Sequence, residues 1–372
     1  MRFSKLGFPL PRTIAVVDLK QISKNLTRLS QIANENYEVF RGAVPMLKSN
    51  AYGHGMTAVA RTLGKHKNTT AFGVATIYEG IVLRQSGVRV PIWVFSDGSP
   101  WNEDSTQACH KFDLTPVFHD LQDLEKSLSR FKGRFHLKFN TGMNRLGIAM
   151  EDVSASFRLL KKKNIFSRLD GICTHLASSD NSKSVLTRIQ ISRFKDIVGA
   201  LPQPTNHIHC SNTDGIYNSK MHSFCTTIRP GLGVYGYSSK NDRSIQPALR
   251  WYALVLQSRK IKPKEAVGYG ETFHAKKSQN IAVLGVGYGD GIHRTLSNKE
   301  ILISDGKKLQ RSMVAGRVSM DLLTLVLQAK SGDWILLFGH NRQQGLQNAK
   351  QAGTIIYEIL TGIGARVPRV YK

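Results

Sequence analysis

Short apolar segments with strong β propensity alternate with amphipathic segments over the first two thirds of the chain. The apolar segments cover residues 44–47, 71–77, 91–95, 114–118, 135–139, 169–174, 207–210 and 227–235. The amphipathic segments have the spacing of helices, with apolar positions at Ile22, Leu26, Leu29 and Ile32 in one and at Ile189, Phe194 and Ile197 in another. Eight strand-plus-helix units in sequence predict a parallel eight-stranded (β/α) barrel with its helices outside. Periodicity alone also allows an open, doubly wound sheet.

The pattern changes after residue 237. A polar stretch at 238–244 is followed by apolar runs at 252–256, 281–286, 300–303 and 322–327, which Gly and Asp-Gly turn signals separate. These runs predict mostly antiparallel β-structure, with one late helix at 347–360. We therefore expect an α/β-barrel domain at residues 12–240 and a mainly β domain at residues 241–372, joined by residues 1–11.

Composition adds a strong positive charge to this picture. The 372 residues include 52 Lys and Arg against 26 Asp and Glu, which gives a formal net charge of 52 − 26 = +26. The basic residues are spread along the chain without interleaved aromatic side chains, so we expect a solvated basic surface and no nucleic-acid partner.

Targeting and cysteine signals are weak. No apolar run approaches the roughly 18 residues of a membrane helix, and Lys5, Pro9 and Pro11 interrupt any secretory signal near the start. The four cysteines form no CxxC pair, so reduced, buried thiols are the simplest expectation and no metal is expected. A cytoplasmic protein without membrane association follows from these observations.

The strongest local signal for chemistry is a lysine at the end of the first predicted barrel strand. Lys48 directly follows the apolar run 44–47, and Gly53 and Gly55 come soon after it. Barrel enzymes keep their active sites at the carboxyl ends of the strands, and glycines allow a ligand to approach the backbone closely. A lysine amine there can form a Schiff base with an aldehyde cofactor. Spacing alone leaves an ordinary surface lysine as an equal alternative.

Segments along the whole chain, in the same order, resemble the alanine racemase family. The matching segments are residues 44–55, 138–147, 174–175, 209–213, 228–236, 268–270, 286–291, 315–321, 357–358 and 366–370. The resemblance implies an isomerase that uses pyridoxal 5'-phosphate to interconvert L-alanine and D-alanine. It also implies that the product supplies D-alanine for cell-wall peptidoglycan.

The resemblance assigns two residues to proton transfer. Lys48 would hold the cofactor aldehyde and exchange the Cα proton on one face of the substrate, and Tyr269 would exchange it on the other. Removal from one face and return on the opposite face need two acid/base groups. A phenol is a weak base at neutral pH, so Tyr269 would need cationic or hydrogen-bonding neighbours.

Further residues would surround the cofactor ring. By resemblance, Arg229 faces the pyridine nitrogen, His209 supports Arg229, and His175 packs near the ring. An arginine does not readily give up a proton, so it leaves that nitrogen unprotonated. The ring is then a weaker electron sink, which should limit transamination and decarboxylation while proton exchange continues.

The cofactor phosphate would be bound beyond the last two barrel strands, where phosphate sites of barrels are common. No GxGxxG fingerprint is present. By resemblance, the donors are Tyr52, Asn212, Thr213, Gly231, Leu232 and Tyr357. The backbone amides of Gly231 and Leu232 suit an anion.

Substrate binding by resemblance falls to Arg145, whose guanidinium suits a carboxylate, and to the backbone amide of Met320. In the family, the residues equivalent to Tyr269 and Met320 reach the barrel of a partner subunit. A homodimer with two composite active sites follows.

Two positions depart from the family pattern. Asn140 stands where aspartate is frequent, two residues after Lys138, whose counterpart in some relatives is carbamylated. The sequence leaves open whether Lys138 carries a carbamate or an anion such as chloride takes that role. Ser319 replaces a frequent cysteine, and we expect no effect because the adjacent contact comes from the backbone.

Other functions remain as alternatives. A broader-specificity racemase, for example one acting on serine, is the nearest, although Tyr357 beside Tyr269 suggests a narrow entrance for small side chains. A basic amino-acid decarboxylase would place an acidic residue where this chain has Arg229. A non-catalytic cofactor-binding protein would resemble the barrel alone, without Tyr269 and the second domain.

Overall fold

The computed structural model describes residues 11–181, 183–305 and 308–372. Contacts divide the chain into two compact units. The barrel unit consists of residues 22–51 and 56–245, and the β unit contains residues 52–55 and 246–372 together with the chain up to residue 21. Residues 1–10, on which the expectations of no secretory signal and of a joining segment depended, lie outside the described residues.

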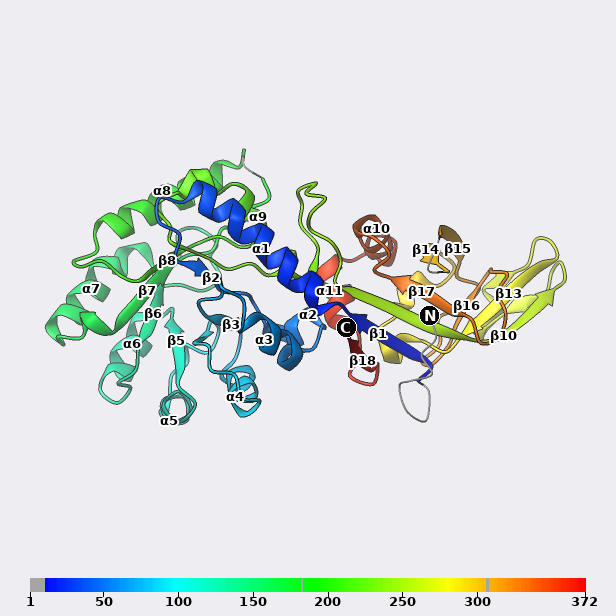
Figure 1. The fold of residues 1–372 in the computed structure, drawn as a ribbon, viewed down its shortest axis with the longest axis horizontal. Coiled ribbons are helices and arrows are strands. Elements are labelled where there is room, and N and C mark those ends of the chain that lie inside the picture. Colours follow the sequence, from blue (N-terminus) through cyan, green and yellow to red (C-terminus); the bar gives the residue numbers. More distant parts are fainter. Residues whose placement is uncertain (1–10, 182, 306–307) are drawn as a thin grey trace. The chain divides into compact units, whose positions relative to one another are not determined.

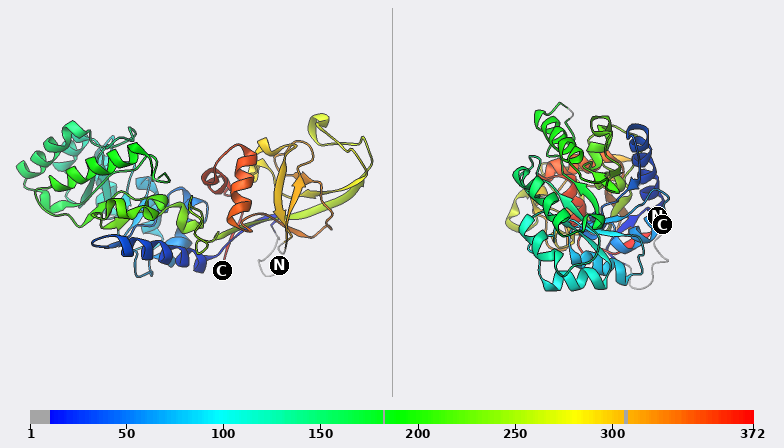
Figure 2. Two further views of the ribbon diagram at one scale, coloured as in Figure 1. Left: turned by 90° about the horizontal axis from the view of Figure 1, so that it is seen from above. Right: turned by 90° about the vertical axis from the view of Figure 1, so that its left-hand side faces the viewer.

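Eight short parallel strands form the centre of the barrel unit, with helices outside them (Figures 1 and 2). They are β2 (Gly42–Ala43), β3 (Phe72–Val74), β4 (Ile92–Val94), β5 (Leu114–Phe118), β6 (Phe135–Lys138), β7 (Leu169–Cys173), β8 (His207–His209) and β9 (Thr227–Ile228). Strands β3 to β8 pair in sequence order, and β2 pairs with β9. A parallel bridge between Met46 and Gly73 joins β2 to β3, and the Thr226 N–H donates to the Ile208 carbonyl beside β8 and β9. The predicted barrel is confirmed.

The outer helices bury one apolar face each. They are α1 (Leu19–Asn36), α3 (Met56–Leu63), α4 (Ile77–Gln85), α5 (Glu103–Lys111), α6 (Leu121–Leu128), α7 (Val153–Lys162), α8 (Val185–Gly199) and α9 (Thr213–Tyr217). The four predicted apolar positions of α1 are buried, as are Phe194 and Ile197 of α8. The prediction that Ile189 faces the core is wrong, because Gln190 and Ile191 occupy the buried face and rotate Ile189 toward solvent.

The β unit is built on a larger, mostly antiparallel sheet, and β11 and β12 form a separate pair. The strands of the unit are β1 (Thr13–Val17), β10 (Leu249–Ile261), β11 (Ala266–Val267), β12 (Phe273–His274), β13 (Gln279–Leu284), β14 (Glu300–Ser304), β15 (Leu309–Met313), β16 (Leu323–Leu325), β17 (Trp334–Phe338) and β18 (Arg369–Tyr371). The main sheet runs β15-β14-β17-β10-β1-β18, and β13 pairs with β10 and β16. Among the described strands of this sheet, β1 and β18 are the one parallel pair. Ile14, Val16, Tyr252 and Leu336 form one of its core clusters.

The late helical segment is two helices, α10 (Arg342–Ala352) and α11 (Ile356–Gly362). The prediction of one helix at 347–360 is wrong, because Gly353 ends α10 in the left-handed conformation at φ 75°. The Asn348 side chain fixes α10 to β14 by accepting from the Leu302 N–H and donating to the Leu302 carbonyl. Among the described residues, no helix is long and apolar enough to cross a membrane.

Candidate active site

A left-handed helical turn, α2 (Lys48–Tyr52), follows the first barrel strand. Its residues Ser49, Asn50, Ala51 and Tyr52 have φ values of 53°, 54°, 54° and 52°. Such a backbone costs roughly 1–2 kcal/mol per residue for side chains other than glycine. Strain of this kind persists only where the surroundings fix it, and it is frequent at functional sites.

Hydrogen bonds to neighbouring segments hold this turn in place. The Ser49 N–H donates to Glu79 Oε1 at 2.6 Å, and Asn50 Oδ1 accepts from the Met56 N–H at 2.8 Å. The Ala51 N–H donates to the Leu47 carbonyl at 2.7 Å. The turn therefore fixes the backbone of Lys48 at the carboxyl end of the strand.

The electrostatic surroundings of Lys48 favour its neutral amine. Burial lowers the pKa of the Lys48 amine, and the positive charges of Arg145 and Arg229 lower it further, while Glu79 acts in the opposite direction. Only the neutral amine attacks an aldehyde, so Lys48 fits the role of a lysine that binds an aldehyde cofactor.

Arg229, one residue after β9, is a buried cation held mainly by carbonyl groups. It is 5% exposed, and its guanidinium donates to the carbonyls of Thr174 at 2.8 Å, His209 at 2.8 Å and Cys210 at 3.3 Å. The guanidinium carbon also lies 5.6 Å from the centre of the Phe95 ring. No ion pair within the described part of the chain involves Arg229, so its charge has no carboxylate partner there.

Hydrogen bonds with a fixed donor direction connect Arg229 to His209 and His209 to His136. Arg229 Nη1 lies 2.6 Å from His209 Nδ1, and His209 Nε2 lies 2.9 Å from His136 Nδ1. Arginine can only donate, so His209 Nδ1 accepts and its Nε2–H donates to His136. His136 then carries its proton on Nε2, which is 3.8 Å from Asp170 Oδ2. Burial, Arg229 and His136 all lower the pKa of His209, which keeps it in this neutral form.

His136 and Asp170 were not among the residues that the sequence predicted. His136 lies in the middle of β6 and is fully buried, and Trp93 packs against both His136 and His209. The signal available in the sequence was a polar residue inside an apolar strand.

His175 lies beside the same guanidinium. Its Nδ1 is 3.3 Å from Arg229 Nη2, and its carbonyl accepts from Gln190 Nε2 at 2.9 Å. Burial lowers the pKa of His175 well below its usual value, and the cations Arg229 and Lys138 add to that effect. His175 is therefore neutral and lies beside Arg229.

Lys138, at the end of β6, is a buried amine close enough to the half-buried Lys48 to be affected by its charge. It is 8% exposed, and burial together with Arg229, Arg145 and Lys48 lowers its pKa to about 8. Arg145 is exposed on the loop that follows. Asn140 Oδ1 accepts from the N–H groups at positions 142 and 144, so the carboxamide of Asn140 organises this loop.

The ends of β8 and β9 present the predicted phosphate donors. Asn212 caps α9: its Oδ1 accepts from the Gly215 N–H at 3.0 Å and from Ser179 Oγ at 2.7 Å, which leaves its NH2 group for a ligand. Thr213 Oγ1 accepts from the Gly231 N–H at 3.2 Å and from the N–H of residue 233 at 2.9 Å, so its own proton is left to donate.

Gly231 also precedes the short 3₁₀ helix η4 (Leu232–Tyr235), which has no side-chain cap. The Leu232 N–H at its start suits an anion.

The remaining predicted residues belong to the β unit. Tyr269 begins the turn η5 (Tyr269–Glu271) and is 72% exposed, and Met320 is 54% exposed. The Met320 carbonyl accepts from the Gly289 N–H at 2.9 Å and from Arg366 Nη2 at 3.2 Å, which holds its loop. The rings of Tyr52 and Tyr357 lie with their centres 6.0 Å apart.

The predicted residues thus divide between the two units. Those of the barrel unit are Lys48, Lys138, Arg145, His175, His209, Asn212, Thr213, Arg229, Gly231 and Leu232, and they lie at or just beyond the carboxyl ends of its strands. Tyr52, Tyr269, Met320 and Tyr357 belong to the β unit.

Comparison with known proteins gives one consistent result. The family model for the alanine racemase N-terminal domain matches residues 17–239, and that for the alanine racemase C-terminal domain matches residues 248–371. The alanine racemase of Carboxydothermus hydrogenoformans is 32% identical over an alignment of 377 positions, gaps included. The alignment covers 96% of this chain and 98% of that protein. That of Halothermothrix orenii is 31% identical, with 97% of each chain covered.

Solved structures agree with the sequence relatives. The alanine racemase of Acinetobacter baumannii superimposes with a TM-score of 0.85 at 28% identity, covering 98% of this chain and 100% of that one. The alanine racemase of Bartonella henselae, solved with covalently bound pyridoxal phosphate, gives a TM-score of 0.84 at 25% identity with the same coverage.

Proposed function

The chain belongs to the alanine racemase family, and we propose that it interconverts L-alanine and D-alanine with pyridoxal 5'-phosphate as its cofactor. The observation that carries this function is the pair of Lys48 and Arg229. Lys48 offers an amine of lowered pKa on a rigid turn, and Arg229 offers a buried cation close enough to contribute to that lowering.

The residues of the barrel unit fit this cofactor. Lys48 would bind its aldehyde carbon, Arg229 would contact its ring nitrogen, and the donors at Asn212, Thr213, Gly231 and Leu232 would hold its phosphate, with Tyr52 and Tyr357 as hydroxyl donors. When bound, pyridoxal phosphate supplies an aldehyde that carries the substrate amino group and a ring that withdraws electrons from Cα.

Two side chains move the proton in this proposal. Lys48 Nζ takes or returns the Cα proton on one face of the substrate, and Tyr269 Oη does so on the other. The neutral amine that burial and the two arginines favour at Lys48 is the form that accepts a proton. The rigid α2 turn limits how far Nζ can move away from Cα.

In this proposal, Arg229 limits how strongly the cofactor ring withdraws electrons from Cα. Its guanidinium only donates hydrogen bonds, and neutral His209 accepts one of them, so this region offers the ring nitrogen no acidic proton. Lower electron withdrawal at Cα disfavours side reactions such as transamination. The hydrogen bond from His209 Nε2 to His136 Nδ1 keeps His209 in the orientation that receives the Arg229 N–H.

Substrate carboxylate binding is assigned to Arg145 and to the Met320 N–H. A pKa of about 8 leaves a sizeable fraction of Lys138 neutral near physiological pH, and a neutral amine is the form that reacts with carbon dioxide. We assign a carbamate to Lys138, because the carboxylate it creates would offset the positive charges of Arg145 and Arg229.

The assembly and the cellular role follow the family. We assign a homodimer in which Tyr269 and Met320 of one chain complete the barrel site of the other, a cytoplasmic location, and supply of D-alanine to peptidoglycan. A division into a barrel domain at 12–240 and a β domain at 241–372 is supported by the two family models, which meet between residues 239 and 248.

The test is chemical trapping at Lys48. In the purified protein, we expect the absorbance of lysine-bound cofactor, its loss on borohydride reduction, and a reduced cofactor on the peptide that contains Lys48. Lys48→Ala should lose this absorbance and racemisation in both directions. The exposed Lys132 provides a matched control, since Lys132→Ala should keep both.

Wild-type turnover and absorbance in Lys48→Ala would refute the assignment. Parallel assays with L-serine would separate a strict alanine racemase from one of broader specificity.

A further inference from the structure

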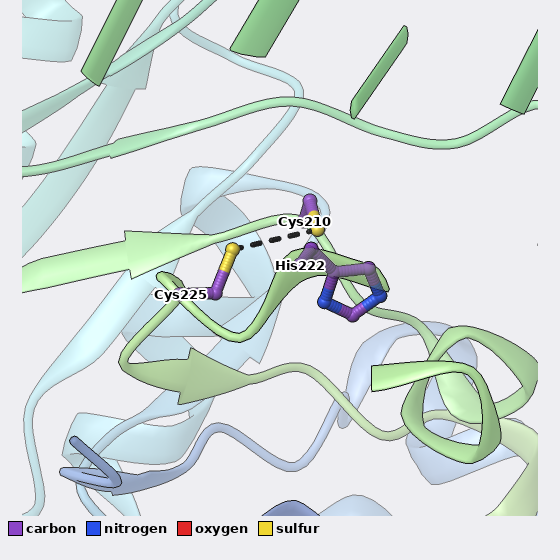
Figure 3. Close-up of side chains that lie close together, drawn as sticks. All are labelled: Cys210, His222 and Cys225. Atoms are coloured by element: carbon purple, nitrogen blue, oxygen red, sulfur yellow. Dashed lines mark hydrogen bonds between the residues drawn. The ribbon is translucent and has the colours of Figure 1, made fainter. Parts of the chain in front are cut away.

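Two cysteines and a histidine lie close together in the barrel unit (Figure 3). Cys210 directly follows β8, Cys225 lies two residues before β9, and His222 ends the short helix η3 (Ser219–His222). All three are buried, with exposures of 1%, 0% and 0%. One ligand atom from each lies within 4.8 Å of the other two, and the two Sγ atoms are 3.6 Å apart.

These distances match the edges of a small metal tetrahedron. With a zinc–sulfur bond of about 2.3 Å and a zinc–nitrogen bond of about 2.0 Å, a tetrahedral site separates its two sulfurs by roughly 3.8 Å and sulfur from nitrogen by roughly 3.6 Å. The two Sγ atoms already have this separation. An imidazole nitrogen within 4.8 Å needs to approach by at most about 1.2 Å to complete the geometry.

The imidazole of His222 contacts the Cys210 side chain but has only long contacts to the neighbouring hydroxyl groups. Among the described residues, its Nε2 is buried with no hydrogen bond, and the contacts of its Nδ1 to Tyr37 Oη and Ser211 Oγ are both 3.5 Å. Buried polar atoms are nearly always satisfied, and an unsatisfied one often indicates an ion or water.

An oxygen ligand is available for a fourth position. Ser211 Oγ lies 3.9 Å from Cys210 Sγ and 2.6 Å from Tyr37 Oη. With Nδ1 of His222 as the nitrogen ligand, the Ser211 Oγ distances of 3.5 Å to that atom and 3.9 Å to Cys210 Sγ are close to the roughly 3.4–3.6 Å edges that an oxygen ligand at about 2.1 Å would give. Two sulfurs, one nitrogen and one oxygen are a donor set that thiophilic divalent cations accept.

We propose that Cys210, His222 and Cys225 bind a structural divalent cation of the zinc type, with Ser211 or Tyr37 as the oxygen donor. Two thiolates neutralise such a cation, so the site adds no net charge beside the buried Arg229. The ion would connect the end of β8 to the loop before β9 and so fix the Cys210 carbonyl that accepts from Arg229. This revises the expectation of no metal, which came from the lack of a CxxC pair: the two cysteines are fifteen positions apart in sequence.

Metal content tests the proposal without depending on racemase activity. The holoenzyme, produced without a histidine tag in zinc-supplemented medium, should contain about one zinc per chain by mass spectrometry of the element. Cys225→Ser and His222→Gln should each lower that content by more than about tenfold, because a hydroxyl or carboxamide binds zinc much more weakly than the thiolate or imidazole that it replaces. Cys109→Ser changes a buried cysteine elsewhere in the barrel unit and should keep the full content.

Cobalt gives a second readout in the unmutated protein. Holoenzyme produced with cobalt and then reduced with borohydride, which removes the cofactor's visible band, should show thiolate-to-cobalt charge-transfer absorption. The proposal would be overturned if the wild-type protein contained no zinc and Cys210 and Cys225 either reacted with an alkylating reagent or formed a disulfide with each other. Zinc that persists undiminished in both variants would overturn it as well.

Discussion

Arg229 determines where protons lie in the barrel site. Because Arg229 can only donate, His209 Nδ1 is an acceptor and the His209 proton lies on Nε2. That Nε2–H donates to His136 Nδ1, so the proton of His136 lies on its own Nε2. A buried guanidinium that donates to three carbonyls is costly to replace, because each carbonyl would lose its donor inside the protein. The residue thus has one role toward the cofactor and another in stability.

Arg229→Glu separates these two roles. The acidic side chain can share a proton with the cofactor ring nitrogen, so we expect the ratio of pyruvate formation to racemisation to rise about tenfold, or about 1.4 kcal/mol. The free energy of unfolding should fall by about 3 kcal/mol, because three buried carbonyls lose a charged donor and face a carboxyl group. Side-product assays and urea unfolding measure the two effects.

Arg229→Gln is the matched control for that substitution. It also removes the charge but brings no acidic proton, so it should lose stability without the rise in pyruvate. An unchanged product ratio in folded, cofactor-loaded Arg229→Glu would count against contact with the ring nitrogen.

The sequence could predict those site residues that belong to a local sequence motif. Lys48, His209 and Arg229 lie at strand ends, where a barrel keeps its chemistry, and the structure places them there. His136 and Asp170 lie inside or before the strand ends, and only the packing of β6 against β7 and β8 brings His136 beside His209. No local pattern carries that information.

The left-handed turn α2 is the element that carries the proposed cofactor lysine. Four consecutive positive φ values occur at residues that include Ala51 and Tyr52, and none of the four is glycine. Hydrogen bonds to Leu47, Met56 and Glu79 offset the conformational cost. A position that is costly for stability is retained where it orients a functional side chain.

Ser49→Gly should release part of this strain. Ser49 is exposed at φ 53°, a conformation that glycine adopts without its steric penalty. After the entropy of glycine in the unfolded chain is subtracted, we expect a gain of about 0.5–1 kcal/mol in the free energy of unfolding. Ser49→Val, with a β-branched side chain at the same φ, should instead lose more than about 1 kcal/mol.

Urea unfolding of both variants at a single protein concentration tests this pair, because subunit association makes stability depend on concentration. Equal stability of Ser49→Gly and Ser49→Val would show that the turn is not strained in solution.

The observed helices and strands agree with the sequence-based prediction where the hydrophobic periodicity is strong. Seven of the eight predicted apolar runs overlap β3–β9, whereas the first, 44–47, lies directly after β2 (Gly42–Ala43), and one face of α1 is buried as its spacing predicted. The turn α2 could not be foreseen, because Ser-Asn-Ala-Tyr contains none of the glycine that usually indicates positive φ. β1 pairs with β10, more than two hundred residues later in sequence, and such pairing has no local signature.

On the scale of the whole molecule, the proposed site draws on both units. Tyr269 and Met320 expose 72% and 54% of their surface in one chain. Exposed apolar and aromatic side chains in a functional position are typical of surfaces that another chain or a ligand covers. The alternation of strands and helices predicted an α/β fold but left an open, doubly wound sheet as an alternative to the barrel. The subunit that supplies each residue came only from the family resemblance.

The division of labour between Lys48 and Tyr269 gives a test of that assembly. The two enantiomers lose their Cα proton on opposite faces, so Tyr269→Ala should suppress deuterium exchange at Cα by a large factor for L-alanine and much less for D-alanine. Complete racemisation must fall in both directions, because the equilibrium constant between enantiomers is unity. The exchange assay, followed separately for each enantiomer, is therefore the informative one, and equal losses would contradict separate roles.

Mixing subunits extends this test to the dimer. If each site takes Lys48 from one chain and Tyr269 from the other, a heterodimer of Lys48→Ala and Tyr269→Ala chains has one site with both changes and one intact site. Such heterodimers, isolated with two different tags, should regain about half of the wild-type activity. Homodimers of either variant, assayed at the same concentration, provide the inactive baseline. If verified heterodimers remained at that baseline, both residues of each site would come from one chain, and the composite site would be wrong.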